Sequence, residues 1–511
     1  MSFRQTRSAW ALSAAMFFAS SVWSQEKTGR VEISAFDSAD GPAVPCRIHL
    51  KDSAGKPVRA EKLPFWFDHF VTAGSVSLDL LPGKYSLEIE RGPEFERFSE
   101  NLLILEGGEK KVRAVFKRLV DLPADGWWPG ELHVHRSLAD IETLMRAEGL
   151  HIAPVITWWN NRNEWTKKDV PKEPLVKFDG NRYYHKMAGE DEREGGALLY
   201  FHLQQPLAIS GSTREFPSPL KFVDEARKQN GAWIDIEKPF WWDVPIWVAS
   251  GQVDSIGIAN NHMARDRMYE TEAWGKPRVV DRLPAPLGNG FWTQEIYYHL
   301  LNCGIRLPPS AGSASGVLPN PVGYNRVYVH VGKDLTWEKW WEGLRAGRSL
   351  VTNGPLLRVR ANGELPGHVF TADAGKGLAI ELKGELTTQD KIRFVEIIKD
   401  GEVNHKVAAD ELARTGSLGA IRFQSSGWFL VRAIADNPKT FRFASTAPFY
   451  VEVGDSKRRV SKSSAKFFLD WVRERTARIK LDDAEQRREV LKHHASAEKF
   501  WQERLDKSNS K

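Results

Sequence analysis

The stretch Glu131-Leu-His-Val-His-Arg136 lies where the pattern of the chain changes, and it decides how the middle of the sequence is interpreted. In a β-strand successive side chains point to opposite faces, so Leu132 and Val134 would face one side and His133 and His135 the other. A His-x-His pair at the end of a strand that leads into a helix is a typical metal-ligand arrangement. The pair alone also fits an ordinary buried strand, so the motif needs context.

The context is an alternation of strands and helices between residues 123 and 355. After the histidine pair, residues 138–150 read as a helix and residues 152–158 as the next strand. This rhythm continues for more than 200 residues and predicts an α/β barrel with parallel strands. Further strands are expected at 197–203, 232–237, 254–259 and 326–331, and helices at 220–229 and 292–301.

The regions on either side have a different pattern. Residues 28–118 contain short segments of alternating apolar and polar residues separated by Gly, Pro and Asp, which predicts a β-sandwich. Residues 356–454 return to the same pattern and predict a second sandwich. Residues 461–511 read as two helices whose aromatic residues would pack on the body of the protein.

The first 24 residues have the features of a secretory signal peptide. Arg4 and Arg7 precede an apolar run over 9–23, and Val22-Trp23-Ser24 offers a small-x-small cleavage pattern. The alternative, a membrane anchor, fits less well because the run is shorter than the ~20 residues that span a bilayer. We therefore expect a periplasmic or secreted protein with no membrane association after the signal is removed.

Charge and cysteine content exclude other classes. The chain has 72 Lys and Arg against 66 Asp and Glu, but residues 457–511 hold 16 basic and 9 acidic residues, so the rest is nearly balanced. A nucleic-acid partner would need a basic stripe on a folded face, and none is expected. The two cysteines, Cys46 and Cys303, fall in different predicted domains, so no disulfide framework is expected.

Several motifs together resemble the polymerase-and-histidinol-phosphatase (PHP)-like metallohydrolases, in the CehA/McbA branch of carbamate hydrolases. The motifs are Gly130-Glu-Leu-His-Val-His135, Gly189-Glu190, Gly231-Ala-Trp-Ile-Asp-Ile-Glu-Lys-Pro239, Val253-Asp-Ser-Ile-Gly-Ile-Ala-Asn-Asn261 and Leu344-Arg-Ala-Gly-Arg-Ser-Leu-Val-Thr-Asn-Gly-Pro355. The stretch Leu81-Pro-Gly-Lys-Tyr-Ser-Leu-Glu-Ile89 likewise resembles a carboxypeptidase-regulatory-like module. The resemblance implies a distorted (β/α)7-like barrel that binds up to three divalent metals and hydrolyses phosphoester, carbamate, ester or amide bonds.

The chain departs from the family at several ligand positions. Trp158-Trp159 stands where the family has Asp-His, Lys238-Pro239 where it has His-Pro, and residues 313–316 lack the final Asp and His. Of the motif ligands, His133, His135 and Glu190 carry over. We therefore expect a reduced site with one divalent ion, Zn, Mn or Fe, and a fourth ligand from His262 or His202.

Lys238 has two interpretations. An ammonium in place of a metal-binding imidazole would supply positive charge to an anionic substrate or a developing oxyanion. Alternatively, Lys238 only forms an ion pair with Glu237 or Asp235. The sequence leaves both open.

Adjacent tryptophans and amides suggest a cleft for a small-molecule or glycan substrate. Four pairs of neighbouring indoles occur, and three of them fall near predicted strand ends or in the loop entering the barrel. Flat indoles suit stacking on sugar rings, although any one of them is an ordinary core residue more often than not. The expected substrate-binding residues are Trp128, Trp158, Trp159, Asn160, Trp241, Asn260 and Arg326.

Two other functions remain open from the sequence. A metal-free glycoside hydrolase would pair Glu190 or Asp191 with Asp235 or Glu237 as acid and base, and the separation that decides this is not visible in a sequence. A barrel that has lost catalysis and only binds carbohydrate is the other. The sequence carries no signal for oligomeric state.

Overall fold

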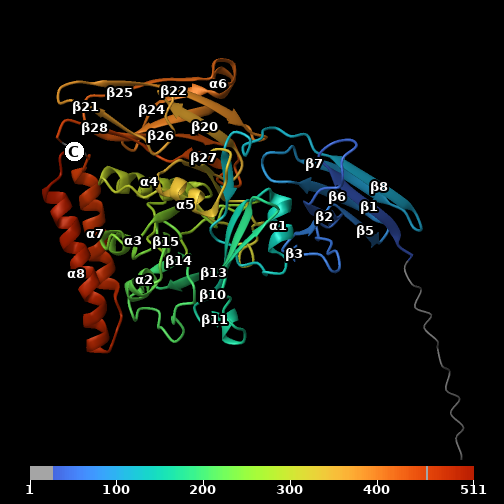
Figure 1. Cartoon of the computed structure of the whole chain (residues 1–511), viewed down its shortest axis with the longest axis horizontal. Helices are drawn as coiled ribbons and strands as arrows, with labels where there is room; N and C mark the ends of the chain where they lie inside the picture. The colour runs from blue at the N-terminus through green and yellow to red at the C-terminus, as the bar shows by residue number, and fades with distance from the viewer. Residues whose placement is uncertain (1–26, 456–457, 511) are drawn as a thin grey trace, which may run out of the picture.

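The computed structural model describes residues 27–455 and 458–510, so the predicted signal peptide at 1–24 lies outside the described residues. Figure 1 shows the N-terminal sheets at one end of the long axis, a central α/β region, C-terminal sheets along one side of it, and two long helices at the other end. The fold is thus mixed α/β with several β-sheets.

The N-terminal region contains two sheets around one apolar core. In one sheet β1 (Gly29–Phe36) lies between β5 (Ser75–Leu80) and β8 (Glu109–Val115). Alternate residues of β1 are buried, as the period of a half-buried strand requires. This agrees with the β-sandwich expected from the alternating sequence. The second sheet has the order β3 (Phe65–Trp66), β4 (His69–Thr72), β2 (Cys46–Asp52), β6 (Gly83–Glu90) and β7 (Phe98–Ile104).

The central region contains most of the helices and the strands of the candidate site. Its strands are β9 (Trp127–Gly130), β10 (Ile152–Trp159), β11 (Arg162–Asn163), β12 (Leu175–Phe178), β13 (Arg182–Arg193), β14 (Gly196–Phe201), β15 (Trp233–Ile236), β16 (Ser255–Ala259), β17 (Pro309–Ala311), β18 (Arg326–His330) and β19 (Ser349–Thr352). Its helices are α1 (Ile141–Glu148), α2 (Pro219–Arg227), α3 (Val244–Ala249), α4 (Gly288–Asn302) and α5 (Trp337–Arg345), with a short 3-10 turn at Glu164–Thr166.

The central strands are not all parallel, which corrects the sequence-based expectation. β10 pairs in parallel with β13, and β15 and β17 pair in parallel with β16. β14, however, is antiparallel to both β13 and β15. The physical reason is the short connection at 194–195, because a turn of two residues joins antiparallel strands whereas parallel strands need a crossover.

The C-terminal region shares hydrogen bonds with the central region. β27 pairs with β19, so the predicted boundary at 355 and 356 is crossed by a continuous sheet. One sheet contains β20 (Leu356–Ala361), β22 (Leu378–Thr387) and β25 (Ser417–Phe423). The other strands are β21 (Val369–Ala372), β23 (Phe394–Lys399), β24 (Glu402–Ala408), β26 (Gly427–Ile434), β27 (Phe443–Thr446) and β28 (Phe449–Val453), and α6 (Ala409–Thr415) follows β24.

The last two helices, α7 (Lys462–Arg478) and α8 (Ala484–Asp506), pack on the central region as the aromatic pattern predicted. Phe468 stacks on Trp501, and the indole N–H of Trp501 donates to the carbonyl of Pro245, 2.9 Å away. Arg475 adds an ion pair to Asp243 at 2.6 Å. Figure 1 shows α7 and α8 beside α3. None of the helices in the described ranges is long and apolar enough to cross a membrane.

Candidate metal centre

Three predicted ligands meet in the central region. His133 Nε2 lies 3.0 Å from His135 Nε2, and Glu190 Oε2 lies 3.5 Å from the first nitrogen and 3.1 Å from the second. All three side chains are at least nine-tenths buried. Glu190 Oε2 makes no hydrogen bond despite its burial. We call these residues the His133 cluster.

The backbone explains why the two histidines converge. Val134 forms parallel bridges with Val155 and with Ser315, so residues 132–135 lie between β10 and the chain that follows β17. This extended segment buries Val134 on one side and places both imidazoles on the other. Gly312 leaves the room that His133 needs, because a Cβ there would lie 2.3 Å from the Cβ of His133.

Glu190 reaches the histidines from β13. Its backbone pairs with Trp159 of β10 and with Leu199 of β14. The preceding Gly189 lies against the indole of Trp158, where a Cβ would come within 1.8 Å of the ring. The Gly189-Glu190 motif therefore combines close packing with an inward carboxylate.

A second carboxylate lies behind His133. Glu237 Oε1 is 3.4 Å from His133 Nδ1, on the side of the ring away from Glu190. Glu237 itself accepts hydrogen bonds from Lys238, from the indole of Trp241 at 2.8 Å and from Asn261 at 2.8 Å. Metal-binding histidines almost always donate their other ring N–H to such a partner, which orients the ring.

The electrostatics of the cluster favour positive charge. Burial lowers the pKa of His133, but Glu190 and Glu237 outweigh burial and raise it to about 10. Burial acts to raise the pKa of Glu190, yet His133 and His135 hold it well below its usual range. Glu190 and Glu237 stabilise the positive charge of a protonated His133. The same negative charge would stabilise a metal cation bound next to this ring.

The distances agree with a tetrahedral ion. Ligand atoms about 2.0 to 2.1 Å from a zinc-like ion at tetrahedral angles are about 3.3 Å from one another. The three separations of 3.0, 3.1 and 3.5 Å lie around that value. Two imidazoles and a carboxylate are also the donor set such ions prefer. The residues present therefore fit one divalent ion.

The structure places Lys238 and Asp235 in supporting contacts. Lys238 Nζ lies 2.7 and 2.5 Å from the two oxygens of Glu237, and it lies over the ring of Trp241. Lys238 therefore forms the ion pair with Glu237 that was one of its two interpretations from the sequence. Asp235 accepts hydrogen bonds from the hydroxyls of Ser255 and Ser310, and burial raises its pKa to about 7.

Neither expected fourth ligand belongs to the His133 cluster. Among the described residues, the group of ligand atoms lying within 4.8 Å of one another contains only His133, His135 and Glu190. The ring of His262 packs between Phe240 and Tyr269. His202 packs edge-on against Trp341. The cluster thus offers three protein ligands.

A groove of about 370 Å³ leads to this cluster. His135 is one of its lining residues, and Trp159 lies beside His135 with ring centroids 5.1 Å apart. The guanidinium of Arg162 lies 5.4 Å from the centre of the Trp159 ring. Trp158 and Trp159 both contribute to the lining of this groove, and Trp159 is the less buried of the two.

The other tryptophans expected at the rim are core residues. Trp128, Trp158 and Trp241 are 6, 2 and 1% exposed. The indole N–H groups of Trp128 and Trp241 are bonded to the carbonyl of Gly332 and to Glu237. For Trp128 and Trp241 the prediction of stacking surfaces is wrong, because packing in the central core buries these large rings. Trp158 is also buried, but it contributes to the lining of the groove.

The polar residues expected to bind substrate have internal partners instead. Asn160 exchanges two hydrogen bonds of 2.9 Å with the backbone of Glu192. Asn260 accepts from the backbone N–H of His262, and Arg326 donates to the carbonyls of Gly323 and Glu148. Asn260 and Arg326 are also buried, so they support loops rather than line the groove.

Three of the four carboxylates of the glycoside hydrolase hypothesis, Glu190, Asp191 and Glu237, have other partners. Asp191 points away from the cluster and binds Arg193 through both oxygens at 2.7 Å. Glu190 and Glu237 are separated by the ring of His133, and both have lowered pKa values because positive neighbours outweigh burial. A sugar ring has no place between them, and neither is a ready proton donor.

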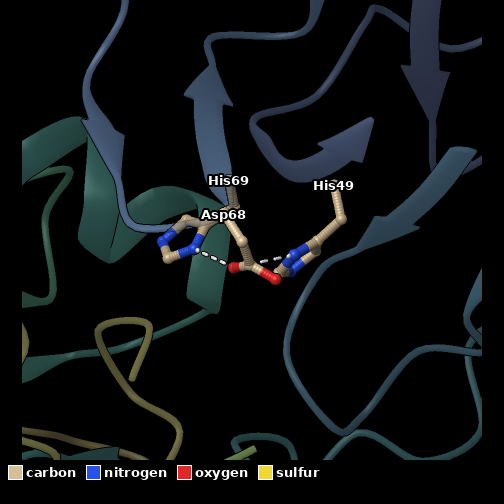
Figure 2. Close-up of side chains that lie close together, drawn as sticks. All are labelled: His49, Asp68 and His69. Atoms are coloured by element: carbon tan, nitrogen blue, oxygen red, sulfur yellow. Dashed lines mark hydrogen bonds and ion pairs between the residues drawn. The ribbon is translucent and has the colours of Figure 1, made fainter. Parts of the chain in front are cut away.

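A second histidine group, which no sequence pattern predicted, lies in the N-terminal region. His49 Nδ1 and His69 Nδ1 each lie 3.2 Å from Asp68 Oδ1 (Figure 2). We call these residues the His49 cluster. Asp68 is 19 positions from His49 and occupies a turn, so no spacing in the sequence pointed to it. The Asp68-His69 dipeptide was the only local signal.

Comparisons with known proteins identify no relative. No protein-family model matches the sequence, and no curated protein matches it. Among solved structures, matches include crystal structures of the N-terminal four Ig domains of Dscam1 isoforms 8.4 and 4.4, each 10% identical. Each match covers 84% of this chain, and 100% and 74% of the Dscam1 chains, with TM-scores of 0.13 and 0.14. TM-scores this low establish no common fold.

Proposed function

We propose that this protein is a metal-dependent hydrolase of the PHP-like class, with one divalent ion held by His133, His135 and Glu190. The observation that carries the proposal is the near-tetrahedral spacing of three buried ligand atoms, one of which makes no hydrogen bond. The sequence motifs around these residues, and the parallel pairings of Val134 with Val155 and Ser315 and of β10 with β13, support a PHP-type barrel. The predicted signal peptide supports export of the protein.

The protein's own residues have defined tasks in this proposal. His133 and His135 hold the ion through Nε2, and Glu190 holds it through Oε2. Glu237 is a positioning residue that keeps the proton of His133 on Nδ1, so that Nε2 presents its lone pair. Lys238, Trp241 and Asn261 keep Glu237 in place. When bound, the ion supplies Lewis-acid activation of water and of the scissile group.

The groove beside His135 indicates how a substrate approaches. Trp159 offers a flat apolar face, and Arg162 offers a guanidinium to an anionic or polar group. A polar substrate with a planar or ring portion suits these two neighbours. Its phosphoester, carbamate, ester or amide bond would lie next to His135.

The experiment is a metal-reconstitution assay on the mature protein. Zn, Mn or Fe is added, and hydrolysis is measured on panels of phosphoesters, carbamates, esters and amides. We expect hydrolysis in one bond class that is lost on chelation and in Glu190→Gln. Glu194→Gln is the matched control, because Glu194 follows the same strand and is paired with Arg214 at the surface.

Two outcomes would overturn the proposal. A protein that binds no metal would remove its basis. If the protein binds metal and binds glycans on an array but hydrolyses none of the tested compounds, it is instead an inactive carbohydrate-binding protein.

A further inference from the structure

A narrow cavity lies where three regions of the molecule meet. Its walls come from the N-terminal sheet at Glu90 and Arg97, from the central region at Glu148 and Arg326, and from the C-terminal region. Its volume is about 50 Å³, and one water needs about 10 to 15 Å³ of such space. The cavity thus has room for a group of a few non-hydrogen atoms. None of the His133 cluster lines it.

The lining of this cavity carries excess positive charge. Five arginines line it, namely Arg47, Arg97, Arg265, Arg326 and Arg442, against three carboxylates, Glu90, Glu148 and Asp390. Arg265 pairs through Nη2 with Glu90 at 3.2 Å and also with Glu88, which lies outside the cavity. Positive charge still exceeds negative charge after Glu88 is included, in a place that is largely removed from solvent.

The arginines are not equally engaged. Arg47 uses all three guanidinium nitrogens, on His49, Glu148 and Glu90. Among the described residues, the side-chain hydrogen bond of Arg97 uses only Nε, which donates to Glu90 Oε1 at 2.6 Å. The two terminal nitrogens of Arg97 are therefore available to donate hydrogen bonds to a ligand in the cavity.

Arg97 and Arg442 lie near one another across the cavity. Burial lowers the pKa of Arg97, and the charge of Arg442 lowers it further. Arg442 reaches the cavity from the C-terminal region and donates through Nε to Asp390 Oδ2 at 3.0 Å. The side chain of Arg442 is 13% exposed and that of Arg97 is 36% exposed. Tyr324 and Asp390 outweigh burial and raise the pKa of Arg442, so it keeps its charge. An anion that accepts hydrogen bonds from both guanidinium groups would offset their repulsion.

Glycines leave room for the guanidinium groups in the cavity wall. A Cβ on Gly323 would lie 2.8 Å from Arg326 Nη2, and a Cβ on Gly354 would lie 2.6 Å from Arg442 Nη2. Gly323 also has a φ of 75°, which glycine adopts freely. The wall is therefore built so that charged side chains lie directly against the backbone.

We propose that this cavity is a binding site for a phosphate group, held by Arg97, Arg265 and Arg442 at the junction of the three regions. The planar guanidinium fork matches the oxygens of phosphate, and the volume suits one such group. The backbone N–H of Arg97 donates a hydrogen bond of 2.8 Å to the side chain of Gln389. This bond joins the wall that carries Arg97 to the wall that carries Asp390.

Isothermal titration with inorganic phosphate tests the proposal on the mature protein in chloride buffer. We expect saturable binding that is at least tenfold weaker in Arg97→Gln. The side chain of Arg97 is 36% exposed, so this variant should fold, and circular dichroism checks it. Arg30→Gln is the matched control, because Arg30 is an exposed arginine of the same region outside the cavity. Arg265→Gln is a second variant.

Two further arms separate this site from other sources of binding. The double variant His133→Ala/His135→Ala should bind phosphate as the wild type does, because the cavity does not include the metal cluster. Phenyl phosphate tests whether the group belongs to a larger ligand: tighter binding than inorganic phosphate indicates an ester, and weaker binding indicates the free ion.

Binding no stronger than that of chloride at equal ionic strength would overturn the proposal. Equal phosphate affinity in Arg97→Gln and Arg265→Gln would overturn it as well, as would loss of binding in the histidine double variant.

Discussion

The His133 cluster and the His49 cluster contain the same groups, two histidines and one carboxylate, but differ in what surrounds them. In both, the ligand atoms lie within 4.8 Å of one another. The His133 cluster has a second carboxylate, Glu237, behind one histidine. The His49 cluster has cations instead: Arg47 donates to His49 Nε2 at 3.0 Å, and Lys51 Nζ lies 2.9 Å from Asp68 Oδ2.

The hydrogen bonds decide which cluster has lone pairs for a metal. Because His49 Nε2 accepts from Arg47, the neutral ring keeps its proton on Nδ1, the atom that faces Asp68. His49 therefore has no nitrogen left for a cation. Burial lowers the pKa of His49 and of His69, and the charges of Arg265 and Arg47 lower these values further. The charges around a group of ligands therefore matter as much as its composition.

The largest expected effect separates the two clusters by metal content. The double variant His133→Ala/His135→Ala should lose its divalent ion completely, whereas His49→Ala/His69→Ala should keep about one equivalent. Elemental analysis of the purified mature proteins measures both. Metal that remains in the first variant and disappears from the second would reverse the assignment.

The next effect concerns the lysine beside each cluster. Lys238 is 3% exposed and paired with buried Glu237, so Lys238→Met leaves a buried charge unpaired and should lower the free energy of unfolding by about 3 to 5 kcal/mol. Lys51 pairs with Asp68, and its side chain is 35% exposed. Lys51→Met should therefore lower the free energy of unfolding by only about 0 to 1 kcal/mol. Denaturant unfolding of both variants checks the difference, and equal losses would contradict it.

Glu237→Gln should weaken metal binding about 10- to 100-fold, the usual effect of removing a carboxylate that orients a ligating histidine. Competition with a chelator of known affinity measures the change. Glu237→Asp should recover part of the affinity if the carboxylate acts by holding His133. A purely structural role predicts a stability loss with unchanged metal affinity in the folded fraction.

The last expected effect concerns Asp68 and the pH dependence of stability. Burial acts to raise the pKa of Asp68, but His49 and His69 hold it well below its usual range. A carboxyl whose pKa is lower in the folded state stabilises the fold above about pH 4, and this contribution disappears as the pH falls. Asp68→Asn should therefore lower the free energy of unfolding by about 1 to 3 kcal/mol at pH 7. The difference in the free energy of unfolding between the wild type and Asp68→Asn should become smaller below about pH 4. A difference that stays the same would contradict this.

Local periodicity in the sequence determined the features that depend on neighbouring residues. The period of an extended chain placed His133 and His135 on one side, and the alternation in residues 28–118 predicted the strands of the N-terminal sheets. The aromatic spacing in residues 461–511 predicted the packing of α7 and α8. Each of these follows from geometry within a few residues, which a sequence shows directly.

Tertiary structure alone decided how distant segments meet. The approach of Glu237 to His133 and the burial of Trp128, Trp158 and Trp241 depend on contacts between segments far apart in the sequence. The neighbours that separate the two clusters, Glu237 for one and Arg47 for the other, are also set this way. Charge acts through space rather than along the chain, so only the folded arrangement determines which histidines can hold a cation.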